Sequence, residues 1–237
     1  MEIAELRLKT HDLNALRGFY VDLLDIALLD EMYGEYFTVD AGETRLRFDQ
    51  GDEDEIYQYH FAFNIPHNQL ADAKAWLAQR TRLIEHDDED EFEYTSWQAT
   101  AIYFRDPVGN VGEFIARHAV DNDSSIPFSG QSIRRVSEIG LVVDSVSAAR
   151  DLLRARLQPA LDLPIWKEGD AQFSALGDNL GLFILVAEGR TWFPTADARA
   201  RSAPVQMRIY GDQHLQFDWQ EYQIEVTPRP RLSASWV

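Results

Sequence analysis

The chain of 237 residues contains no cysteine, and this absence excludes disulfide bridges and metal sites built from thiolates. Positive charge is scarce, because 22 Lys and Arg residues stand against 40 Asp and Glu residues, which gives a formal net charge of −18. Since phosphate binding requires a basic face, this balance argues against a nucleic-acid partner. It argues equally against binding to an anionic membrane surface.

Long apolar runs are also missing. No segment approaches the ~20 apolar residues that a bilayer-spanning helix requires. The amino-terminal stretch MEIAELRLK carries charges where a signal peptide has an apolar core. We therefore expect a cytoplasmic protein without a membrane partner. Apolar residues nevertheless make up 45% of the chain, so a sizeable core can be buried.

Residues 2–50 predict a strand, a helix and three further strands. The segment EIAELRLKT alternates apolar and polar side chains, as a half-buried strand does. Asp12 is placed to cap a helix, and the apolar side chains after it recur along one helical stripe. Three shorter strands are indicated near residues 26–30, 35–40 and 44–49. The order of this module is β-α-β-β-β.

The same order recurs from residue 57. YQYHFAFNIP predicts a strand and HNQLADAKAWLAQR an amphipathic helix, and further strands are indicated at residues 82–86, in WQATAIYFRDP and in NVGEFIAR. The polar, turn-rich segment DNDSSIPFSGQ indicates a linker. After it, VSEIGLVVDSVSAARDLLRARL repeats the strand, cap and helix a third time, and four further strands follow.

These repeats predict an α+β fold of βαβββ modules. We divide the chain into a two-module domain at residues 1–118, a linker at 119–131, a third βαβββ-like module with extra strands at 132–227, and a C-terminal tail at 228–237. The third module carries Glu138 in its first strand but offers no histidine to complete a second metal site, so we expect it to be structural or to form a homodimer. Its segment GRTWFPT, residues 189–195, indicates either a buried aromatic anchor or an edge of a cleft.

Strand alternation shows which polar side chains share a face. A carboxylate such as Glu113, in the middle of an apolar strand, costs free energy unless something pairs with it. In each long strand the apolar face suits packing under helices. The polar face must therefore be exposed to solvent or to a cleft. The polar faces therefore predict a sheet that lines a cleft. The side chains expected to point into this cleft are Glu5, Arg7, Arg47, His60, Tyr103 and Glu113.

At these residues the chain resembles the vicinal oxygen chelate superfamily, which includes glyoxalase I, extradiol dioxygenases, fosfomycin-resistance transferases and bleomycin-resistance binding proteins. The resemblance is carried by the duplicated βαβββ pattern, by Phe19 and Tyr20 in the first helix, and by YFRDPVGNVGEFIAR, residues 103–117. It is good over residues 1–118 and weaker over 132–227. It implies a cupped mixed sheet, as in glyoxalase, curled around one divalent metal ion.

The resemblance also implies the site residues. Metal ligands in the superfamily typically come from the first strand of each module and from the last strand of the second, which here gives Glu5, His60 and Glu113. Glu113 would also be catalytic, with Tyr103 beside it as an acid, base or hydrogen-bond donor. Arg47 occupies the position of a fourth ligand and cannot bind a cation. A set of two carboxylates and one imidazole suits Mn²⁺, Fe²⁺, Zn²⁺ or Ni²⁺.

Two functions remain open from the sequence. One is a metal-dependent enzyme of the glyoxalase or dioxygenase type, acting on a small substrate that chelates the metal through adjacent oxygens. The other is a metal-free small-molecule binding protein of the bleomycin-resistance type, in which Glu113 pairs with an arginine. In either case the small-molecule partner is expected to be held by polar side chains of the cleft, which are Arg7, Lys9, Arg47, Asn64 and Arg117.

Overall fold

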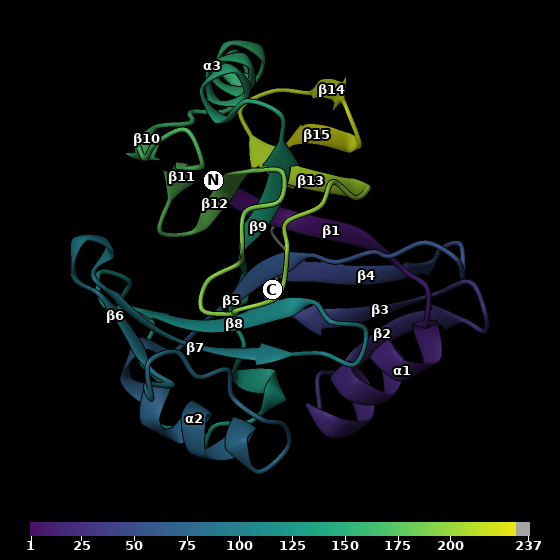
Figure 1. Cartoon of the computed structure of the whole chain (residues 1–237), viewed down its shortest axis with the longest axis vertical. Helices are drawn as coiled ribbons and strands as arrows, with labels where there is room; N and C mark the ends of the chain where they lie inside the picture. The colour runs from purple at the N-terminus through teal and green to yellow at the C-terminus, as the bar shows by residue number, and fades with distance from the viewer. Residues whose placement is uncertain (231–237) are drawn as a thin grey trace, which may run out of the picture.

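The computed structural model describes residues 1–230 and has the α+β architecture that the sequence predicts (Figure 1). A seven-stranded mixed sheet has the order β14-β15-β13-β1-β4-β3-β2. Its strands are β1 (Glu2–Thr10), β2 (Leu28–Met32), β3 (Tyr36–Ala41), β4 (Thr44–Gln50), β13 (Val205–Gly211), β14 (Leu215–Trp219) and β15 (Tyr222–Pro228). Most of the predicted tail, residues 231–237, lies outside the described part of the chain.

An eight-stranded mixed sheet has the order β10-β11-β12-β9-β5-β8-β7-β6. Its strands are β5 (His60–Ile65), β6 (Phe92–Tyr94), β7 (Ala99–Arg105), β8 (Val111–Arg117), β9 (Arg135–Val143), β10 (Ile165–Lys167), β11 (Phe173–Asp178) and β12 (Gly181–Ala187). The α-helices are α1 (Leu13–Arg17), α2 (Leu70–Ala78) and α3 (Val146–Leu157). A π-helical turn, Gly18–Leu23, extends α1.

Two of the α-helices, α1 and α3, begin at side-chain caps, as the sequence predicts. The Asp12 carboxylate accepts a hydrogen bond from the Ala15 amide at 2.9 Å, and the Ser145 hydroxyl accepts one from the Ala148 amide at 3.4 Å. Each cap satisfies one of the amide groups that a helix leaves free at its start. In each module the first strand then lies parallel to the last, as β1 with β4, β5 with β8 and β9 with β12.

The extra strands at the carboxyl end form a fourth, abridged unit. β13 lies parallel to β15, which pairs with β14, and a short connection at residues 212–214 takes the place of a helix. β13 then pairs antiparallel with β1, just as β9 pairs antiparallel with β5. Residues 1–230 therefore contain four related units rather than three, and these units combine in two pairs.

The pairing of units differs from the expectation that the two modules of residues 1–118 line one cleft. The first module pairs with β13–β15, and the second pairs with the third, so the first two modules lie in different sheets. The physical reason is that every first strand offers the same kind of free edge. Local alternation of side chains predicts such an edge but does not select its partner.

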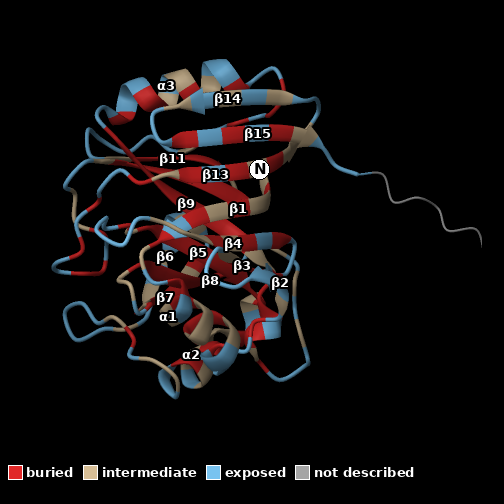
Figure 2. Cartoon of the chain, turned by 90° about the vertical axis from the view of Figure 1, so that its right-hand side faces the viewer, coloured by how far each residue is buried: buried red, intermediate tan, exposed pale blue. Residues whose placement is uncertain are grey.

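One large core joins the two sheets and the helices. Its side chains include Leu6 and Phe48 from the seven-stranded sheet, and Phe61 and Phe114 from the eight-stranded sheet. Figure 2 shows this buried layer running through the central strands of both sheets. The opposite face of the eight-stranded sheet carries small side chains such as Ala62, so it leaves room for a cavity. Over the described residues, no helix has the length and apolar character needed to cross a membrane.

Candidate metal centre

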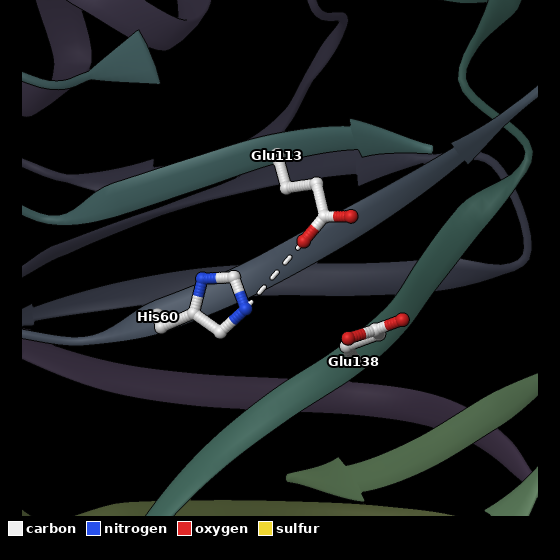
Figure 3. A group of neighbouring side chains, drawn as sticks. All are labelled: His60, Glu113 and Glu138. Carbon is white, nitrogen blue, oxygen red and sulfur yellow. Dashed lines mark ion pairs between the residues drawn. The ribbon is translucent and has the colours of Figure 1, made fainter. Parts of the chain in front are cut away.

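Three buried side chains on neighbouring strands point toward one another on this face (Figure 3). His60 lies on β5, Glu113 on β8 and Glu138 on β9, and one ligand atom from each lies within 4.8 Å of the others. In the strand register, Ala62 of β5 is the direct partner of both glutamates. Because an alanine side chain is so short, the two carboxylates can approach each other across β5.

The hydrogen bonding of His60 defines its free nitrogen. Nδ1 lies 3.1 Å from the Val111 carbonyl oxygen, which can only accept, so Nδ1 carries the hydrogen. Burial lowers the pKa of His60 to about 4; the Val111 bond acts in the opposite direction, and the charge of Arg190 lowers the pKa further. The ring is therefore neutral near pH 7, and Nε2 presents its lone pair to Glu113.

When Glu113 is ionised, two acceptor atoms therefore face each other. His60 Nε2 and Glu113 Oε2 are 3.5 Å apart. A neutral imidazole nitrogen and a carboxylate oxygen repel each other at this distance unless a proton or a cation lies between them. A histidine whose Nδ1 is held by a backbone carbonyl, with Nε2 free, is the usual arrangement of a metal-ligating histidine.

The two carboxylates carry more negative charge than their surroundings neutralise. Burial raises the pKa of Glu113 well above its ordinary value, and the nearby Glu138 raises it further, while Arg117 and Tyr103 lower it. Burial also raises the pKa of Glu138, against the effect of Arg117. A single cation, Arg117, therefore faces two buried acids. A divalent cation between the carboxylates would remove the remaining repulsion.

Tyr103 lies beside Glu113, its direct partner across β7 and β8. Its hydroxyl is 2.7 Å from that of Tyr94. Burial raises the pKa of Tyr103 well above its ordinary value, and the charge of Glu113 adds to the effect. Tyr103 therefore remains a phenol at neutral pH, and it acts as a hydrogen-bond donor rather than as a base.

A cavity of about 360 Å³ opens beside the three residues. His60, Glu113 and Glu138 line one part of it. Most of the other lining side chains are aromatic or aliphatic: Tyr94, Trp97, Tyr103, Ile115, Phe173, Ile184, Trp192 and Phe193. Lys167 and Arg190 also reach its wall. Such a cavity, apolar with a few converging polar groups, is typical of a small-molecule site.

The turn before Glu113 sets the register that places it here. Asp106 accepts hydrogen bonds from the Asn110 amide at 2.9 Å, from the Asn110 side chain at 2.7 Å and from the Tyr20 hydroxyl at 3.0 Å. Gly109 has a φ of +94°, which a glycine adopts without strain. A slip of one residue in β8 would turn Glu113 into the apolar core.

Glu5 does not join this cluster, and this corrects the predicted ligand set. It lies on β1 in the other sheet, where its carboxylate pairs with Arg7 at 2.5 Å and with Arg208 at 2.9 Å. Glu138 takes its place because β9, and not β1, is the first strand that pairs with β5. A signal was present in the sequence, since Glu5 and Glu138 each lie seven residues before a helix cap, at Asp12 and Ser145.

The residues predicted to hold a substrate are divided between the two sheets. Arg7 lines a separate cavity of about 280 Å³ on the seven-stranded sheet. Arg47 pairs with Asp49 and stacks on Tyr36, and Lys9 is exposed. Only Asn64 and Arg117, of the five, lie beside the candidate metal centre. Arg117 contacts both Glu138 and Asn64, and neither Asn64 nor Arg117 lines the cavity.

Sequence comparisons identify no relatives, because no protein-family model and no curated protein matches the chain. Solved structures match at the level of the fold. A Bacillus subtilis protein described as a "putative dioxygenase" has a TM-score of 0.64 at 13% identity, over 97% of this chain and 86% of that one. A mutant of glyoxalase I from Zea mays has a TM-score of 0.56 at 11% identity, over 96% and 92%. The chain therefore has the fold of the vicinal oxygen chelate superfamily, as the sequence resemblance predicted.

Proposed function

We propose that the chain is a metal-dependent enzyme of the glyoxalase or dioxygenase type. It binds one divalent ion, Mn²⁺, Fe²⁺, Zn²⁺ or Ni²⁺, through His60, Glu113 and Glu138. Its substrate is a small molecule with two adjacent oxygens. One observation supports the proposal most directly. His60 Nε2 and Glu113 Oε2 lie 3.5 Å apart, and the buried carboxylate of Glu138 lies beside them.

The donor set fits such an ion. One imidazole and two carboxylates suit borderline and hard divalent cations. On β12, Ile184 reaches the cavity wall and offers no ligand atom, so positions would remain for water or substrate. The ion, when bound, would act as a Lewis acid on the substrate oxygens. The protein's own contribution is to hold three ligands on rigid strands and to surround them with apolar walls.

Tyr103 and Glu113 are the residues that we assign to catalysis. Glu113 lines the cavity, so its carboxylate is within reach of a bound substrate and is placed to exchange a proton with it. Tyr103 stays protonated beside it and can donate a hydrogen bond to a developing negative charge. The aromatic walls exclude water from this proton exchange.

The alternative is a metal-free binding protein, and one contact favours it. Arg117 already pairs with Glu138, so part of the acidic charge is neutralised without an ion. In that case Glu113 would carry a proton and donate it to His60 Nε2. A homodimer and a cytoplasmic location stay predictions from the sequence.

Metal analysis of matched variants tests the proposal. The protein is stripped with a chelator, incubated with Mn²⁺, desalted and analysed for bound metal. We expect about one ion per chain for the parent and for Glu5→Gln, and a large loss for Glu138→Gln and Glu113→Gln. Circular dichroism checks that each variant is folded. If the parent binds no divalent ion, the enzyme proposal fails; if Glu5→Gln alone loses the ion, the site has been assigned to the wrong sheet.

A further inference from the structure

The segment of residues 188–204, which joins β12 to β13, closes one side of the cavity. Trp192 is 2% exposed, and its ring centroid lies 5.1 Å from that of His60. Phe193 packs against Phe92 with centroids 5.0 Å apart and against Tyr103 at 6.1 Å. The segment GRTWFPT is therefore an edge of the cavity, which was one of the two roles that the sequence left open.

Aromatic rings form most of the wall beyond the three candidate ligands. Trp97 and Phe173 both line the cavity, with ring centroids 6.3 Å apart and an angle of 31° between their planes. Rings that line a cavity favour a planar, polarisable ligand, because stacked and edge-to-face contacts add to the area that is buried. An extended peptide would instead need polar partners that this wall does not supply.

Two cations reach the same cavity. Arg190 is half-buried and Lys167 is exposed, and both line the wall. In the part of the chain that the structure describes, neither forms an ion pair, although the protein carries a net charge of −18. The guanidinium of Arg190 lies 5.3 Å from the Phe173 ring centroid, and its hydrogen bond is a long one of 3.5 Å to the Thr191 carbonyl.

A half-buried guanidinium that forms no ion pair within the described residues is costly, and a bound anion would compensate it. Burial lowers the pKa of Arg190, and Asp170 acts in the opposite direction. A second donor lies close by, because the indole nitrogen of Trp192 is buried and has no hydrogen-bond partner within the described residues. Arg190, Lys167 and Trp192 thus offer donors to an acceptor that the protein itself does not provide.

We propose that the cavity takes an aromatic anion, whose ring packs against Trp97, Phe173 and Phe193 and whose carboxylate meets Arg190 and Lys167. This inference rests on the proposed function, since it names the substrate class of the same cavity. Arg190 becomes the residue that selects the charge of the ligand.

Binding of a matched pair of probes tests this inference. Naphthalene-2-carboxylate and the neutral naphthalene-2-carboxamide have nearly the same shape. Their affinities for the chelator-treated protein are measured by calorimetry and by quenching of tryptophan fluorescence. We expect the carboxylate to bind at least about tenfold more tightly than the amide, as one charge-assisted hydrogen bond allows. Arg190→Met should reduce the affinity for the carboxylate to that for the amide and leave the amide unchanged.

Arg201→Met is the control, because Arg201 is exposed on the same segment and does not line the cavity. It should leave both affinities unchanged. Equal binding of acid and amide, no binding of either, or a carboxylate affinity that Arg190→Met does not reduce would overturn the inference. Since the measurement needs no metal, a protein that binds the carboxylate through Arg190 but takes up no Mn²⁺ would refute the proposed function alone.

Discussion

Arg117 donates a hydrogen bond to Glu138 across the intervening strand β5, and the Arg117 side chain is closed to water. The guanidinium also donates from Nε to the Asn64 side chain of β5 at 3.2 Å. The contact therefore ties together the second and third units of the fold. It also holds one of the candidate metal ligands, so a change to this pair should affect stability and the proposed metal binding together.

Removal of Arg117 should destabilise the metal-free protein strongly. Arg117→Met leaves two carboxylates buried without a counter-charge, and we expect a loss of about 3–5 kcal/mol in the free energy of unfolding, measured with urea in the presence of a chelator. Arg105→Met is the control, because its pair with Asp197 is partly exposed and should contribute less than about 1 kcal/mol. The double change Arg117→Met with Glu138→Gln should recover part of the loss. Equal losses for Arg117→Met and Arg105→Met would contradict the prediction.

A bound divalent ion should stabilise the folded chain. At a metal concentration about 100 times the dissociation constant, the gain in unfolding free energy is about 2.7 kcal/mol. We expect this gain with Mn²⁺ for the parent and not for Glu113→Gln, as measured by urea unfolding with and without the ion. Glu225→Gln, on the seven-stranded sheet, should keep the full gain. A gain of the same size in Glu113→Gln would show that Mn²⁺ binds elsewhere.

Gly140 provides the space in which Trp192 packs. A Cβ at residue 140 would lie 2.5 Å from Cη2 of the Trp192 indole, so Gly140→Ala must displace that ring. We expect a loss of about 1–3 kcal/mol in the free energy of unfolding and a change in tryptophan emission. Gly18→Ala has open space around the new carbon and should change stability by no more than ~1 kcal/mol, in either direction. If Gly140→Ala keeps both the parent stability and the parent emission, Trp192 does not pack as described.

The buried Asp106 should make stability depend on pH. Burial raises its pKa to about 6, against the hydrogen bonds from Asn110 and Tyr20. Between the unfolded value near 3.8 and about 6, the folded state binds more protons, so the contribution of Asp106 to stability is present at low pH and is lost as pH rises through 6. Relative to Asp106→Asn, the parent should lose about 2 kcal/mol of unfolding free energy between pH 4 and pH 7. Parallel stability profiles of the two proteins would refute this.

The sequence by itself determined three of the four units of the described chain and two of the three candidate ligands. Side-chain alternation, the cap at Asp12 and the turn before Glu113 are local features, and each acts through neighbours along the chain. They therefore predicted most of the strands and the faces on which His60 and Glu113 lie. The strand expected at residues 82–86 was wrong, because only isolated bridges form there and β6 follows at Phe92–Tyr94.

Only the tertiary structure decided which units meet. Four first strands offer similar edges, and their pairing depends on contacts between residues far apart in the chain, which no local pattern encodes. Because of this pairing, Glu5 lies on the seven-stranded sheet, where it forms a salt bridge with Arg208. Glu138 lies beside His60 on the eight-stranded sheet. The same pairing also brought Arg190 to the cavity beside His60, from the segment GRTWFPT, for which the sequence left open a buried aromatic anchor or an edge of a cleft.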